Sequence, residues 1–247
     1  MFVKTVGPAD AKIMLVGEAP GEDENATGQP FKGFSGRMLD QLLASAGISR
    51  HDCLLANVAR EQPPGNKIVF FYEDGKSWIP KPIMRQWLQL LKEEIYLYKP
   101  NIIVALGATA MRELTGLRGI DDYRGYIVNS TLAPGYKVLS TYHPNKINHE
   151  YKLHFTAIMD LKKAKRNQGY PGMPKEERRL VSTPTKREFV DYIKFLTYEN
   201  DGPFSLDVET LQPGSHVDIL GLGHKSDYAM AFTLIQGRNP VYSMETE

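Results

Sequence analysis

The residues best suited to chemistry in this chain lie in one glycine-rich, acidic segment. Residues 17–24 read Gly-Glu-Ala-Pro-Gly-Glu-Asp-Glu, and residues 28–33 read Gly-Gln-Pro-Phe-Lys-Gly. Glycine and proline interrupt helix and strand patterns, and adjacent carboxylates need water or a partner, so we expect a loop here. The apolar run Ile13–Val16 before it predicts a buried strand, and a strand entering such a turn is typical of the ligand-binding edge of an α/β sheet. Taken alone, the segment also fits an ordinary strand–helix loop with a solvated acidic tip.

Polar residues recur at the ends of further apolar runs. The run at 54–58 holds a single amide and precedes Pro-Pro-Gly-Asn at 63–66. The run at 101–107 opens into a helix near residue 108, and the run at 137–144 ends in His-Pro. Because the carboxyl ends of parallel strands lie at one edge of a sheet, side chains from these ends are expected to converge on one pocket. Those side chains are Glu18, Glu24, Phe31, Asn57 and His143.

Together these motifs resemble the uracil-DNA glycosylase superfamily, most closely its family 4 branch. The resemblance covers roughly residues 8–165, with the motifs in the family's order and spacing. It implies an α/β fold with three layers, αβα, around a central parallel four-stranded sheet. It also implies binding to DNA that contains uracil, single- or double-stranded, and hydrolysis of the N-glycosidic bond of that base.

The resemblance gives two side chains a role in holding uracil. Asn57 would read the base, since one carboxamide both donates to O4 and accepts from N3–H. On base rates alone, an Asn near a strand end is more often a turn former. Phe31 would be the flat apolar face on which a flipped base stacks. The alternative is a purely structural role, in which Phe31 anchors the loop beneath the sheet. The other residues expected in the substrate pocket are Gly17, Ala19, Pro20 and Gly21.

Three residues are expected to act on the bond that breaks. His143 would donate a hydrogen bond to O2 of uracil, where negative charge develops as the bond to the sugar is cleaved. Ala19 stands where the best-known branch has a water-orienting Asp, so that task falls to Glu18 or Glu24. The position of Glu24 on the Phe31 side of the loop favours Glu24. Glu22 and Asp23 are expected to form a solvated tip.

The chain differs from the family 4 pattern in its cysteine content. Family 4 enzymes usually hold an iron–sulfur cluster through four cysteines, whereas this chain has only Cys53. Glu61 takes a cysteine's place in the run Arg60–Asn66. One thiol cannot form a four-thiolate site, so we expect no cluster and no other cofactor in this domain.

The C-terminal third has a different pattern. We expect a glycosylase-like domain at 1–168, a linker at 169–182, and a helix followed by a strand meander at 183–247. This last part resembles the start of the RNase H-like 3′–5′ exonuclease domain of family A DNA polymerases. Asp207 and Glu209 would then be part of a metal site, with Mg²⁺ held only by a complete exonuclease site. The alternative is a strand-end acid at Asp207 and a turn cap at Glu209.

That domain order resembles the N-terminal part of DNA polymerases from large lytic bacteriophages. The expected partner is therefore the rest of a DNA polymerase chain, with polymerase and exonuclease activity absent from this piece. A second function stays open on these grounds: a catalytically weak DNA-binding or uracil-sensing module of the polymerase. A nucleotide-binding protein unrelated to repair is disfavoured, because the phosphate-loop and dinucleotide-binding glycine motifs are missing.

Composition sets the broad class. The chain has 247 residues and a net charge of +1. With 42% hydrophobic residues, this length is enough for a full core in one or two domains. A single cysteine excludes a disulfide framework, and no segment has the length of a membrane span or the pattern of a signal peptide. We therefore expect no membrane partner and a cytoplasmic protein, in the bacterial host cell if the chain is encoded by a phage.

Overall fold

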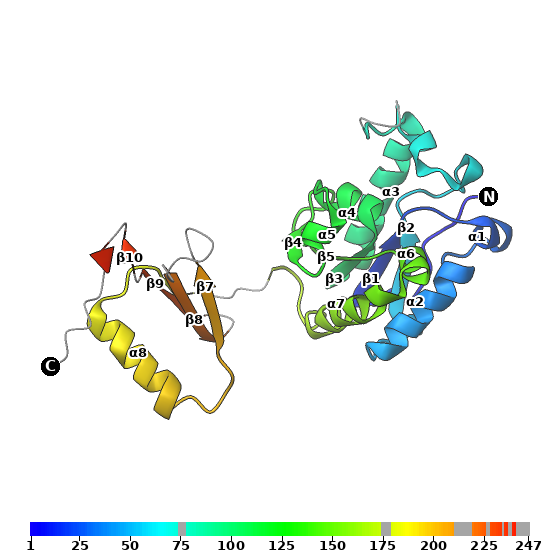
Figure 1. Cartoon of the computed structure of the whole chain (residues 1–247). Coiled ribbons are helices and arrows are strands. Elements are labelled where there is room, and N and C mark those ends of the chain that lie inside the picture. The colour runs from blue at the N-terminus through cyan, green and yellow to red at the C-terminus, as the bar shows by residue number, and fades with distance from the viewer. Residues whose placement is uncertain are drawn as a thin grey trace. The chain divides into compact units, whose positions relative to one another are not determined.

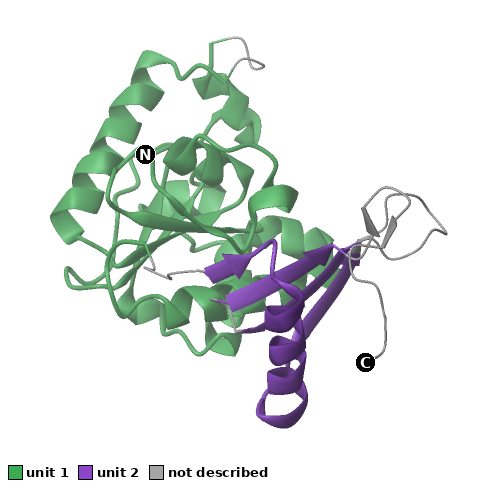
Figure 2. Ribbon diagram, turned by 90° about the vertical axis from the view of Figure 1, so that its left-hand side faces the viewer, with its two compact units in different colours: residues 1–173 green, residues 174–247 purple. Residues whose placement is uncertain are grey.

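The computed structural model describes residues 1–73, 78–173, 179–209, 219–225, 228–233, 235–236 and 239–240. The chain forms two compact units, Met1–Met173 and Pro174–Glu247 (Figure 2). The segment 169–182, expected to be a linker, therefore divides between the units. Its strand β6 (Arg179–Val181) pairs in parallel with a strand of the second unit, because an extended edge segment satisfies its backbone by joining a sheet.

The first unit is built on a sheet of five strands. The four expected parallel strands are present, and their order with the fifth is β2-β1-β3-β5-β4. The fifth strand pairs antiparallel to β5, so the sheet is mixed and not purely parallel as expected. This edge strand was missed because it has only three residues, without a buried apolar run. The strands are β1 (Ile13–Gly17), β2 (Cys53–Asn57), β3 (Ile102–Leu106), β4 (Ile127–Asn129) and β5 (Lys137–Thr141).

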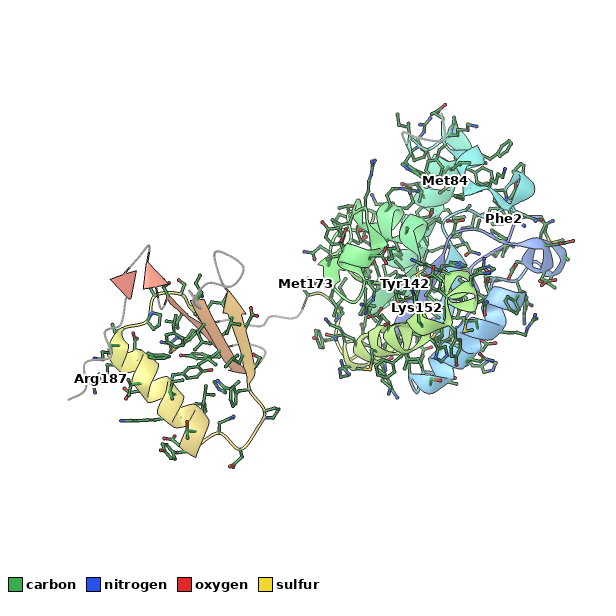
Figure 3. All side chains as sticks on the ribbon, in the orientation of Figure 1. Phe2, Met84, Tyr142, Lys152, Met173 and Arg187 are labelled. Atoms are coloured by element: carbon green, nitrogen blue, oxygen red, sulfur yellow. The ribbon has the colours of Figure 1, made fainter. Side chains whose placement is uncertain are left out.

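Helices cover both faces of this sheet and give three layers (Figure 1). Alternate side chains of β1 point to opposite faces, as strand geometry requires. Ile13 and Leu15 pack with α2 (Phe34–Ser45), α6 (Pro144–His149) and α7 (His154–Arg166). Met14 and Val16 pack with α3 (Pro82–Tyr98) and α4 (Ala108–Thr115). Figure 3 labels one member of each cluster, Tyr142 from the first and Met84 from the second.

Short elements complete the first unit. Where the sequence predicts a loop after β1, the acids at 22–24 open a short helix, α1 (Glu22–Thr27). Carboxylates in the first turn stabilise a helix by interacting with its exposed N–H groups, which explains the difference. Glu22 and Asp23 are exposed, as expected of a solvated tip. The remaining short helices are α5 (Ile120–Tyr123) and the 3-10 turns Arg50–Asp52, Pro64–Asn66, Ile68–Phe71 and Tyr151–Leu153.

The second unit is a small sheet with one helix. The helix α8 (Lys186–Tyr198) begins at Thr185, whose side chain and that of Glu188 cap each other's backbone. The sheet order is β6-β9-β8-β7, and β7, β8 and β9 form the expected antiparallel meander. These strands are β7 (Ser205–Glu209), β8 (Ile219–Lys225) and β9 (Tyr228–Thr233). A separate pair of short strands, β10 (Ile235–Gln236) and β11 (Asn239–Pro240), is antiparallel. None of the helices in the described ranges is long and apolar enough to cross a bilayer.

Candidate active site

A cavity of about 230 Å³ opens at the carboxyl ends of β1 and β2 and beside the start of α6. It brings together the five side chains that the strand-end pattern predicts, together with Ala19, Pro20 and Gly21. Gly17 lies beneath it, since a Cβ there would be 2.4 Å from Asn57 Oδ1 and 2.6 Å from Phe31 Cζ. The lining residues are Glu18, Ala19, Pro20, Gly21, Glu24, Phe31, Ser35, Asn57, Pro63, Asn66, His143 and Asn145.

Four lining residues were not predicted. Pro63 and Asn66 belong to the Pro-Pro-Gly-Asn run that follows β2, which the sequence marked as a motif without assigning its residues to the pocket. Asn145 follows the His-Pro pair by one residue, so its place in the chain is the available signal. Ser35 lies in the first turn of α2 and carries no sequence signal of its own.

Asn57 is the last residue of β2 and is 4% exposed. Its backbone pairs with Gly17 of β1, which sets its side chain at the sheet edge. Within the described part of the chain, its amide makes no hydrogen bond to another residue. A buried amide normally has partners, so this one is available to a ligand with one donor and one acceptor.

Phe31 contributes an aromatic face to the cavity. Its side chain is 6% exposed, and its backbone has a φ of 56°, the left-handed region that bulky residues rarely adopt. Gly36 makes room for this conformation, because a Cβ there would lie 1.9 Å from the Phe31 carbonyl oxygen. The ring is thus fixed at the cavity by its backbone and does not hang in a loose loop.

His143 is held in one orientation at the N-terminus of α6. The Asn145 backbone N–H donates to Nδ1 at 3.2 Å, so the proton of the neutral ring is on Nε2. Burial lowers the pKa of His143 from 6.5 to about 4, and the nearby Glu24 carboxylate opposes this shift in part. At neutral pH the residue is an uncharged imidazole that donates from Nε2.

The two candidate acids differ in how much of each carboxylate is occupied. Glu24 is buried; its Oε1 accepts from the N–H groups of Lys32 and Gly33 at 2.9 and 3.0 Å, and its Oε2 accepts from Gly21 at 3.0 Å. Glu18 is half-buried and accepts one hydrogen bond, from the Thr109 hydroxyl to Oε2 at 2.6 Å. Both oxygens of Glu24 therefore bind the loop backbone, whereas Oε1 of Glu18 has no partner among the described residues.

The residues around Cys53 and in the loop at 60–66 do not fit an iron–sulfur cluster. Cys53 is buried in β2, and burial together with Asp52 raises the pKa of its thiol to about 12, so it is a poor thiolate ligand. In the described ranges no group of three His, Cys, Asp or Glu side chains is arranged to hold a metal ion. Glu61 is exposed, and the adjacent Arg60 is fully buried in an ion pair with Glu94.

Asp207 and Glu209 belong to β7 of the second unit. Asp207 is exposed and lies opposite Gly221 of β8. Among the described residues, Asp207 belongs to no group of three His, Cys, Asp or Glu side chains that could hold a metal ion.

The fold and the cavity define an α/β protein with one small polar site at the edge of its central sheet. The chain belongs to the uracil DNA glycosylase superfamily, whose sequence profile matches residues 4–165. The type-4 uracil-DNA glycosylase of Thermotoga maritima is 34% identical over 170 residues, which cover 64% of this chain and 79% of that protein. The type-4 enzyme of Archaeoglobus fulgidus is 31% identical over 168 residues, or 66% of this chain and 79% of the relative. A type-5 uracil-DNA glycosylase of Pyrobaculum aerophilum is 30% identical over 152 residues, covering 58% and 65%.

Proposed function

We propose that this protein is a uracil-DNA glycosylase, a hydrolase that removes uracil from DNA by cleaving the bond between the base and C1′ of deoxyribose. The observation that carries the proposal is the free amide of Asn57 beside Phe31 and a neutral His143 in one cavity. Family membership and the similarity to type-4 uracil-DNA glycosylases support it.

Recognition follows from the amide and the ring. A uracil turned out of the helix stacks on Phe31, and Asn57 donates to O4 while it accepts from N3–H. Cytosine has an amino group at position 4 and no proton on N3, so both bonds are lost with it. A site built for such a pair rejects the wrong base because its own buried polar atoms stay unpaired.

Cleavage follows from the charge that develops on each fragment. The electron pair of the C1′–N1 bond moves into the uracil ring and its negative charge reaches O2, where the Nε2–H of His143 donates a hydrogen bond. The sugar becomes oxocarbenium-like and water adds to C1′; the proton that this water loses is balanced by protonation of the uracil anion, so that neutral uracil and an abasic site result. We infer that the unoccupied oxygen of Glu18 orients this water and stabilises the cation, while Glu24 shapes the loop. This assignment differs from the sequence expectation, which favoured Glu24.

The test is the release of uracil from single- and double-stranded oligonucleotides by the full chain, scored as alkali-labile abasic sites. His143→Leu, which has no donor, should lose about 10²–10³ in rate, the usual cost of one such donor. Uracil release from neither substrate would contradict the proposal. Tight binding of uracil-containing DNA without release would instead favour the second candidate, a uracil-sensing module with weak or no catalysis.

For the second unit we propose the beginning of an exonuclease-like domain, as in the polymerases of lytic bacteriophages. The support is the β7-β8-β9 meander with Asp207 and Glu209 two positions apart on β7. Two-metal hydrolysis needs more carboxylates than these, so no nuclease activity is expected from this chain. Mg²⁺-dependent degradation of single-stranded DNA that Asp207→Ala abolishes would contradict this.

A further inference from the structure

Phe31 has a conformation that its own backbone does not favour. A bulky residue with a φ of 56° is strained and keeps that conformation only if the surroundings fix it. The strain is useful at this position, because it turns the ring into the cavity. The question is which contacts hold the backbone of residues 30–33 against relaxation.

Two charged side chains bind this backbone, one at its N–H groups and the other at its carbonyl groups. The Glu24 carboxylate accepts from the N–H groups of Lys32 and Gly33. The Arg50 guanidinium donates from Nη2 to the carbonyl oxygens of Pro30 and Phe31 at 3.1 and 2.8 Å. Its Nη1 is paired with Asp40 at 2.6 Å, which fixes the plane of the guanidinium.

Packing of the Phe31 side chain and hydrogen bonds to the neighbouring backbone both hold this segment. Phe31 lines the base cavity, whereas Pro30 and Lys32 line a second cavity of about 210 Å³ together with Gln29, Arg50 and His51. Residues 30–32 therefore lie between two cavities, and the Phe31 side chain also belongs to the buried apolar cluster that contains Ile13 and Leu15. Hydrogen bonds to charged groups are about twice as strong as neutral ones, so those from Arg50 dominate on the carbonyl side.

We infer that Arg50 is a positioning residue for base binding. Its two hydrogen bonds, from Nη2 to the carbonyls of Pro30 and Phe31, keep the Phe31 ring in the orientation in which the base can stack on it. Arg50 does not line the base cavity and acts only through Phe31. The inference rests on the proposed function for the identity of the base, but the placement of the ring can be measured without it.

The first measurement is independent of activity. With 4-fluorophenylalanine incorporated at position 31 of the full chain, the ¹⁹F resonance reports the environment of that ring. Arg50→Ala should shift or broaden this resonance, and Arg50→Lys, which keeps a positive charge and N–H donors but lacks the planar guanidinium, should give an intermediate spectrum. The matched control is Arg85→Ala, since Arg85 also donates to a carbonyl, that of Pro80 at 2.7 Å, but does not line the cavity. An unchanged resonance in folded Arg50→Ala overturns the inference.

The second measurement is a double-mutant cycle on uracil excision. Arg50→Ala should lower kcat/KM by about 10- to 100-fold, the range for a misplaced binding group. In a Phe31→Ala background the same substitution should change kcat/KM by less than about twofold, because its effect passes through the ring. An equal loss in both backgrounds shows a general structural role and refutes positioning.

The variants also separate this inference from the proposed function. If the wild-type chain releases no uracil while Arg50→Ala still shifts the ¹⁹F resonance, the proposed function fails and the positioning role stands. Asp40→Asn removes only the surface ion pair and should have a smaller effect than Arg50→Ala in both measurements. Should Arg50→Ala not fold, as judged by circular dichroism, the Arg50→Lys spectrum decides. A ¹⁹F resonance identical to that of the wild type then refutes the positioning role of Arg50.

Discussion

Asn57 ends the buried strand β2, His143 follows the buried strand β5, and each leaves a polar atom for a ligand. The amide has no partner in the described part of the chain, and the imidazole accepts at Nδ1 and so keeps its Nε2 proton. Neither atom is charged at neutral pH, which suits a neutral base. In the proposed function, recognition depends on protonation state and tautomer, and substitutions that change either one are the informative tests.

Asn57→Asp should weaken uracil recognition, because a carboxylate cannot donate to O4. A buried polar partner left unsatisfied costs about 1–3 kcal/mol, so kcat/KM should fall by about 10- to 100-fold. Asn129→Asp introduces the same charge on exposed β4 and is the control. The readout is single-turnover excision of uracil opposite guanine. Equal rates for wild type and Asn57→Asp would remove Asn57 from the reader role.

The lowered pKa of His143 predicts the acid limb of the pH profile. The neutral imidazole, which accepts at Nδ1 and donates from Nε2, persists until the pH falls to about 4, so excision should not titrate near 6.5, the ordinary value. Between these values the unfolded chain binds a proton that the folded chain does not, so stability should fall as the pH is lowered through that window. Single-turnover rates from pH 4 to 8 check the first point. An inflection near 6.5 that His143→Gln removes would contradict it.

At the scale of secondary structure, β1 and β2 position Asn57 and Phe31 by packing them closely against Gly17. Strands β1 and β2 pair in parallel up to Gly17 and Asn57, and at Gly17 only a hydrogen fits between the strand, the amide and the Phe31 ring. Gly17→Ala should therefore displace Asn57 or Phe31 and lower excision by about 10- to 100-fold, as misplacement of about 1 Å does. Gly169→Ala, where a Cβ meets nothing within 4 Å, should leave the rate unchanged. Excision by Gly17→Ala at the wild-type rate would show that the cavity tolerates the methyl group.

The segment after β2 is held by ion pairs and aromatic contacts. Arg60 is fully buried against Glu94 of α3 and donates to Thr5, and Arg112 stacks 3.9 Å from the Trp78 ring centre. Glu94→Ala leaves a buried guanidinium without its partner and should cost about 3–5 kcal/mol in the free energy of unfolding. Glu93→Ala, one exposed residue away, is the control in denaturant melts. A loss below about 1 kcal/mol would mean that this pair does not hold the loop.

At the scale of the molecule, every cavity residue lies in the first compact unit. Residues 1–173 should therefore fold and release uracil as fast as the full chain. With one cysteine and no thiolate set, the purified protein should contain no iron or labile sulfide, and chelation with EDTA should not change the rate. Stoichiometric iron retained through chelation, or loss of excision on truncation, would contradict the respective part.

Much of this architecture could be predicted from the sequence. The buried runs that form β1, β2, β3 and β5 have the unbroken apolar pattern of parallel strands, and the turn residues after them mark the ligand edge. The short edge strand β4 and the pairing of β6 could not be predicted in this way. Neither carries a long apolar run, and both depend on which sheet edge is free to receive them.

The sequence by itself determined the family, the residue types at the sheet edge and the lack of thiolates, because these depend on residue identity and spacing along the chain. Only the tertiary structure decided which carboxylate oxygens are bound by the protein and which are left for a ligand. Glu18 and Glu24 look alike in sequence, yet three backbone N–H groups converge on Glu24 and a single hydroxyl reaches Glu18. Likewise Arg50 is one basic residue among many until folding brings its guanidinium to the Phe31 carbonyl. Hydrogen-bond partners distant in sequence are set by how the strands and helices pack, which residue identity and local pattern do not encode.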